Sequence, residues 1–157
     1  MPAIRFVALP TALVTALQTG SPDANGQIPE RAVSTGGDGV PCRHCLDVVA
    51  ADEAYLILAH RPFTTLQPYA ECGPIFLHAV ACERYAETAA LPPMLGSAQY
   101  ILRGYNRAER ILYGTGQVVP TAQIPQRAQE LLAREDVAYI HVRSATNNCF
   151  QCRIERA

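Results

Sequence analysis

Apolar positions along the chain fall into short runs separated by polar stretches, and most of these runs have the length of β-strands. The strand-like runs cover residues 4–9, 55–61, 74–80, 99–105, 110–119, 137–143 and 149–155. The run at 110–119 is interrupted by Gly114-Thr115-Gly116. Since strands outnumber helical segments, the pattern predicts an α+β fold: a mostly antiparallel sheet with two or three peripheral helices.

Two segments repeat apolar residues at helical spacing instead. Leu9, Leu13 and Leu17 lie on one face of a helix that starts near Pro10 and ends at Gly20. A second helix starts at Pro125, and its predicted buried face consists of Ile124, Ala128, Leu131 and Leu132.

The stretch from about 20 to 40 follows neither period and is rich in glycine, proline, serine and aspartate. This composition predicts a loop or a flexible arm. With 157 residues in total, we expect the chain to form a single domain, 1–157, that includes this arm.

The composition excludes several classes of protein but does not indicate a particular function. An apolar fraction of 49%, a charged fraction of 17% and a net charge of −1 exclude a disordered chain and argue against nucleic-acid or membrane partners. No apolar run reaches the roughly 18 residues of a membrane span, and the run near the start is a poor signal peptide. We therefore expect a cytoplasmic protein with reduced thiols. The 13 basic residues are all arginine, which suggests a GC-rich bacterial gene and excludes lysine-dependent chemistry.

Several segments together resemble the bacterial family catalogued as domain of unknown function 1203. The segments are Pro22-Asp23-Ala24-Asn25-Gly26-Gln27, Pro29-Glu30-Arg31, Pro41-Cys42-Arg43-His44-Cys45-Leu46, Gly73-Pro74-Ile75-Phe76, Leu102-Arg103-Gly104-Tyr105, Ile140-His141-Val142-Arg143-Ser144-Ala145 and Asn148-Cys149-Phe150-Gln151-Cys152-Arg153. The resemblance implies family membership but no activity. Some relatives keep only the first cysteine of each Cys-x-x-Cys pair, which implies that a metal is not obligatory for the family. At the position of Cys72, relatives commonly carry serine.

The six cysteines include two Cys-x-x-Cys pairs, Cys42 with Cys45 and Cys149 with Cys152. Two such pairs can supply the four thiolates of a tetrahedral structural zinc site. The long separation between the pairs requires the fold to bring them together. Our leading hypothesis is therefore a small protein that binds a structural zinc through these four cysteines, with its biochemical activity unknown.

Two other interpretations of the pairs stay open. In regular strands, residues three apart point to opposite faces, so Cys152 would join Phe150 and Ile154 in the core and Cys149 would face outward. Only a knuckle or the start of a helix would bring Cys42 and Cys45 together. A helix opening at Pro41 would instead make Cys42 a reactive thiol suited to disulfide exchange.

Cys72 and Cys82, with His78 between them, form a third group of potential ligands. Their spacing matches no compact metal motif, and Cys72 lies in a predicted turn, where it would be exposed. We therefore do not expect this group to bind metal.

An alternative function rests on polar residues of the predicted strands. Tyr139, His141 and Arg143 share one face of the run at 137–143, and Arg103 lies on another strand. With Cys149 as nucleophile and His141 as base, Arg103 and Arg143 would hold a small anionic substrate of a thiol- or histidine-dependent enzyme. The simpler interpretation is that Tyr139, His141 and Arg143 form a solvated outer face. The oligomeric state cannot be inferred from these residues.

Overall fold

A computed structural model describes residues 1–37 and 39–157. Its elements in chain order are β1 (Ile4–Val7), α1 (Thr11–Gln18), β2 (Glu30–Val33), β3 (Val40–Pro41), β4 (Val48–Val49), β5 (Ala54–His60), β6 (Gly73–His78), β7 (Gln99–Tyr105), β8 (Gln117–Pro120), α2 (Ile124–Leu132), β9 (Tyr139–Ser144) and β10 (Phe150–Arg156). A short 3-10 turn, Thr121–Gln123, leads into α2. Among the described residues, no helix has the length and hydropathy needed to cross a membrane.

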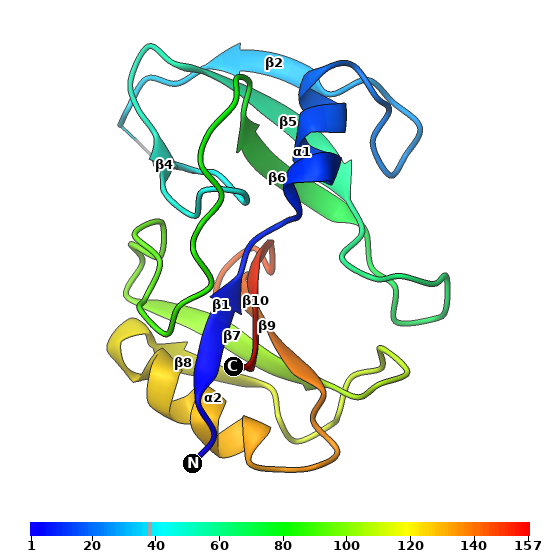
Figure 1. The fold of residues 1–157 in the computed structure, drawn as a ribbon, viewed down its shortest axis with the longest axis vertical. Helices are drawn as coiled ribbons and strands as arrows, with labels where there is room; N and C mark the ends of the chain where they lie inside the picture. Colours follow the sequence, from blue (N-terminus) through cyan, green and yellow to red (C-terminus); the bar gives the residue numbers. More distant parts are fainter. Residues whose placement is uncertain (38) are drawn as a thin grey trace.

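The lower half of the molecule in Figure 1 is a five-stranded antiparallel sheet with α2 packed on it. Its strand order is β1-β10-β9-β7-β8, so the first and last strands of the chain pair side by side. Apolar side chains of α2, among them Ile124 and Leu132, are buried against the sheet together with Leu102 and Ile140. This burial is what fixes α2 in place, because a helix of its length is marginal in water by itself.

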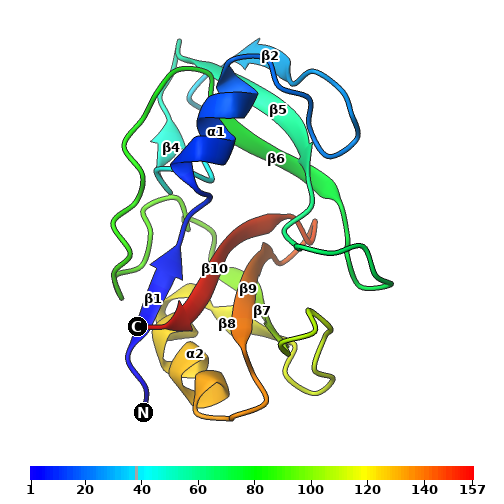
Figure 2. The same cartoon turned by 45° about the vertical axis from the view of Figure 1, so that its right-hand side comes forward.

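The upper half contains a three-stranded sheet of order β2-β5-β6, with α1 beside it, and the small β3–β4 hairpin. Val14 and Leu17 of α1 pack with Leu56, Ile75 and other residues of β5 and β6 in a second hydrophobic cluster. Figure 2 shows that β10 begins close to this second sheet and runs down into the lower sheet, where its arrow ends beside the C-terminus.

The predicted α+β class is confirmed in its main feature, because the strands are mostly antiparallel, although the helices are few and short. The predicted arm at 20–40, of which position 38 lies outside the described residues, contains β2 and the start of β3. The hydrophobic pattern does not predict β2, because the exposed and partly charged residues of this strand show no apolar alternation. Backbone hydrogen bonds to β5 hold it as an edge strand.

A register shift between Phe150 and Cys152 interrupts the alternation of side chains between the two faces of β10. Phe150 pairs with Arg143 and Cys152 pairs with Val142, which is the arrangement of a β-bulge. Cys152 packs in the lower hydrophobic cluster, whereas Phe150 packs in the upper one. The prediction that Phe150 and Cys152 share a face is therefore wrong, because regular alternation does not continue through a bulge.

Candidate metal centre

The first Cys-x-x-Cys pair lies in the loop of the β3–β4 hairpin. The N–H of Cys42 donates to the carbonyl oxygen of Asp47 at 2.9 Å, and the N–H of Leu46 donates to the carbonyl oxygen of Cys42 at 2.9 Å. Leu46 closes the turn with a left-handed backbone conformation, φ 54°. This tight knuckle places Cys42 and Cys45 together, as the hypothesis of a zinc site requires, and excludes a continuous strand there.

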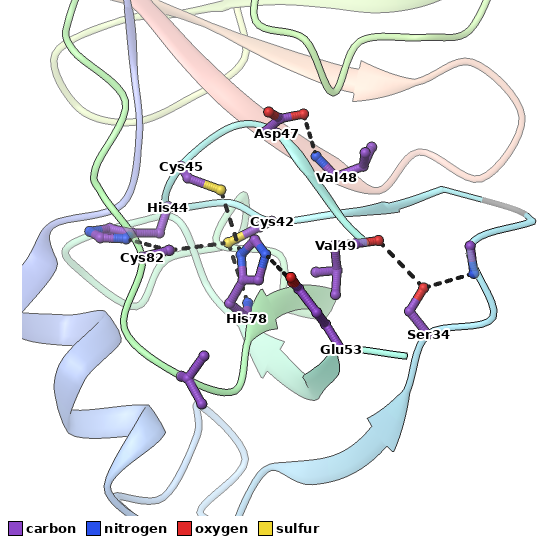
Figure 3. Close-up of polar contacts among 12 residues, drawn as sticks. Ser34, Cys42, His44, Cys45, Asp47, Val48, Val49, Glu53, His78 and Cys82 are labelled. Carbon is purple, nitrogen blue, oxygen red and sulfur yellow. Dashed lines mark hydrogen bonds and ion pairs between the residues drawn. The ribbon is translucent and has the colours of Figure 1, made fainter. Parts of the chain in front are cut away.

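Two further side chains complete a cluster of four potential ligands, as Figure 3 shows. His78 ends β6, and Cys82 lies in the segment that leaves this strand. The Sγ atoms of Cys42 and Cys82 are 3.9 Å apart, and Sγ of Cys45 is 3.6 Å from Nδ1 of His78. The four ligand atoms all lie within 4.8 Å of one another.

Neighbouring groups hold the ligands in this orientation. Nε2 of His78 lies 3.3 Å from a carboxylate oxygen of Glu53, on the side of the ring away from the cysteines. Nδ1 of His44 is 3.1 Å from Sγ of Cys82, and Nε2 of His44 is 2.9 Å from the hydroxyl of Thr11 in α1. With the proton of His44 on Nδ1, the imidazole donates to the sulfur and accepts from the hydroxyl, so both ring nitrogens are satisfied.

The thiols of the cluster affect one another strongly. A hydrogen bond from Cys45 lowers the pKa of Cys42 to about 4. The same interaction raises the pKa of Cys45, because Cys45 supplies the proton. Burial raises the pKa of Cys82 to about 11. These contacts favour the thiolate form of Cys42, and the thiolate is the form of cysteine that binds metal ions.

The cluster fits a tetrahedral ion of zinc size. With bonds of about 2.3 Å to sulfur and about 2.0–2.1 Å to nitrogen, tetrahedral ligand atoms lie about 3.6–3.8 Å apart. The separations of 3.9 Å and 3.6 Å are close to these values. A carboxylate on the second nitrogen of a ligating histidine is also a recurrent feature of zinc sites. The residues present can therefore hold a metal ion.

The structure brings Cys42 and Cys45 of the predicted ligand set to this cluster, but not Cys149 and Cys152. Cys152 is buried in the lower hydrophobic cluster, and Cys149 precedes β10, with its Sγ 3.8 Å from the carbonyl oxygen of Asn147. The structure instead adds His78 and Cys82, which the sequence analysis did not expect to bind metal.

The spacing His78-x-x-x-Cys82 is the signal that could have revealed the second pair of ligands. Zinc sites commonly combine one Cys-x-x-Cys pair with a second pair of ligands that has three to five residues between its members. In the sequence, His78 and Cys82 were grouped with Cys72, which matches no metal motif. In the structure Cys72 is exposed, and its Sγ lies 3.6 Å from the side-chain oxygen of Asn25.

The residues of the alternative enzyme hypothesis form a linked group on the lower sheet, without a bond to Cys149. Arg143 lies 3.0 Å from Nδ1 of His141 and 3.6 Å from Glu71, and Glu71 also pairs with Arg103 at 3.0 Å. Among the described contacts, none joins the Cys149 thiol to His141. Burial and the nearby arginines hold the pKa of His141 well below its ordinary value.

The face of β9 that carries Tyr139, His141 and Arg143 is buried rather than solvated. Phe63 and Tyr105 pack against His141, as does Phe150 from the bulged start of β10. The interpretation as a solvated outer face is therefore wrong, because the upper half of the molecule and the loop after β5 cover this face.

Comparison with known proteins supports one assignment. A family model described as "Protein of unknown function (DUF1203)" matches residues 39–156, which confirms the resemblance. Neither the curated proteins nor the solved structures contain a match to the chain.

Proposed function

The chain belongs to the DUF1203 family, and for this member we propose a zinc-binding protein whose metal is structural. The observation that carries the proposal is the convergence of three thiols and one imidazole, with all four ligand atoms within 4.8 Å. Cysteine sulfur and histidine nitrogen are the ligands that zinc prefers in proteins.

The number of ligands favours a structural role. Four protein ligands fill the tetrahedral positions of zinc, so no position stays open for water or substrate. Thiolate ligands also require reduced cysteines, and the proposal therefore includes the cytoplasmic location expected from the sequence.

The bound ion would connect three parts of the upper half of the chain. Cys42 and Cys45 come from the β3–β4 loop, His78 from the end of β6, and Cys82 from the segment that descends to the lower sheet. In the same loop, the N–H of Arg43 donates to Phe76 of β6 at 3.2 Å. Because metal binding of this kind contributes directly to folding free energy, removal of the ion should loosen these connections.

The test is metal analysis of the purified chain and of matched variants under reducing conditions. We expect about one zinc per wild-type chain. Cys82→Ser and His78→Ala should lose most of the metal and lower the melting temperature. Cys72→Ser and Cys149→Ser are the matched controls, because both remove a thiol outside the cluster, and both should retain the metal.

Two results would contradict the proposal. One is wild-type protein that takes up no zinc even when zinc is supplied in excess. The other is a Cys82→Ser variant that retains the full metal content while Cys149→Ser loses it, which would restore the ligand set predicted from the sequence.

A further inference from the structure

A second feature of the metal-binding loop does not contribute to the metal cluster. Arg43 follows Cys42 directly, and its guanidinium extends to the start of β10. Its Nε donates to the carbonyl oxygen of Phe150 at 2.9 Å, and its Nη1 donates to that of Pro41 at 2.7 Å. Only 3% of the residue is exposed. The guanidinium is therefore rigidly held inside the protein.

The charge of Arg43 has no carboxylate partner among residues 1–37 and 39–157. Arg143, the other buried arginine nearby, pairs with Glu71. The guanidinium is protonated at neutral pH, as arginine side chains are throughout proteins. Because an unpaired buried charge is costly, buried arginines are normally paired with an anion.

The guanidinium of Arg43 adjoins a cavity. Nη2 of Arg43 has no hydrogen-bond partner among residues 1–37 and 39–157, and Arg43 is one of the residues that line the cavity. The cavity has a volume of about 480 Å³, which is within the usual size range of small-molecule sites.

The walls of this cavity combine one positive charge with apolar and neutral polar groups. Arg43 is the only charged side chain among the described residues that line it. Phe76, Met94 and Tyr100 supply apolar surface, and Ser97 is one of several neutral polar residues. A site with this lining selects a ligand with one anionic end and an apolar body.

We infer that Arg43 and this cavity form a binding site for a small organic oxyanion, a carboxylate or a phosphate monoester with an apolar body. The anionic oxygen atoms lie on the guanidinium, where charge-assisted hydrogen bonds are strongest. The apolar body lies against Phe76, Met94 and Tyr100. This site does not depend on which metal the cysteine cluster binds. It would give the protein a small-molecule ligand in addition to the proposed structural ion.

Isothermal titration calorimetry with benzoate, phenyl phosphate and benzamide tests this inference on the purified full chain. Benzamide has the size and shape of benzoate without its charge. We expect benzoate or phenyl phosphate to bind at least about tenfold more tightly than benzamide, because only the anions form charge-assisted bonds with Arg43. The stronger of the two anions identifies the preferred head group.

Two variants locate the site. Arg43→Gln should weaken binding of the anion at least about tenfold. Gly96→Phe provides an independent variant in case Arg43→Gln does not fold, because Gly96 lines the cavity and an added Cβ meets no atom within 4 Å. Gly116→Phe is its matched control, since Gly116 has equally open space and does not line the cavity.

The expected result is anion binding that Gly96→Phe abolishes and Gly116→Phe leaves unchanged. The inference is overturned if neither anion binds at millimolar concentration, or if benzamide binds as tightly as the anions. Unchanged binding of the anion to folded Gly96→Phe would overturn it as well.

Discussion

Replacement of Glu53 by Gln tests whether the contact between Glu53 and His78 supports metal binding. The carboxylate lies 3.3 Å from Nε2 of His78, so it orients the imidazole and makes Nδ1 a stronger donor to a metal. Loss of such a partner typically weakens metal affinity 10- to 100-fold. The Glu53 side chain is 53% exposed, and water screens its charge. We therefore expect the lower end of this range, about tenfold or about 1.4 kcal/mol.

Competition with a chromophoric zinc chelator measures this change, because the chelator reports the free metal at equilibrium. Glu135→Gln is the matched control, since it removes the same charge from an exposed position away from the cluster. We expect Glu135→Gln to retain wild-type affinity. Equal zinc affinities of wild type, Glu53→Gln and Glu135→Gln would refute the view that Glu53 supports the ligand.

Three further predictions concern parts of the molecule outside the metal cluster. Gly104→Ala should lower the free energy of unfolding, measured in urea, by about 1–3 kcal/mol. The reason is that the added Cβ would lie 3.1 Å from Oγ1 of the buried Thr115. An unchanged urea midpoint would contradict this packing. Burial lowers the pKa of His60 from 6.5 to about 4, so the unfolded state takes up the proton first as the pH falls through this window. The free energy of unfolding should then decrease from pH 7 to pH 5, and less so in His60→Asn; equal decreases in both proteins would count against the shift. In alkylation of the native protein followed by mass spectrometry, the exposed Cys72 should react early. Cys152, whose pKa is raised by burial to about 12, should react only after unfolding. The reverse order would be inconsistent with the fold.

Apolar periodicity predicted most of the strands that bury side chains. The run at 110–119 was predicted too long, since only Gln117–Pro120 is a strand, and the two-residue β4, which buries Val49, was not predicted. The run at 99–105 corresponds to β7, and the helix expected at Pro125 corresponds to α2, which begins one residue earlier. β2 was missed because edge strands are held by backbone hydrogen bonds, which the side-chain pattern does not record. The bulge at Phe150 was missed for a related reason, because the pattern of a strand does not show where an extra residue enters the ladder.

The metal cluster was predictable only in its local part. Cys42 and Cys45 are close in sequence, and their pairing requires only a tight turn. His78 and Cys82 join them because β6 runs beside the knuckle, where Cys42 forms a bridge with Phe76. Spacing in the sequence can mark His78 and Cys82 as a pair, but only the packing of the upper sheet brings that pair to Cys42 and Cys45.

The position of β10 between β1 and β9 has a consequence for synthesis on the ribosome. β1 is synthesised before the other strands of this sheet, but its partner among the described strands is β10, at residues 150–156. The lower sheet therefore cannot close before these residues leave the exit tunnel, and β1 stays unpaired until then. The four candidate metal ligands, in contrast, all lie between positions 42 and 82. The proposed ion would therefore find its whole ligand set while the lower half is still being made, which would give the nascent chain one ordered region before the sheet forms.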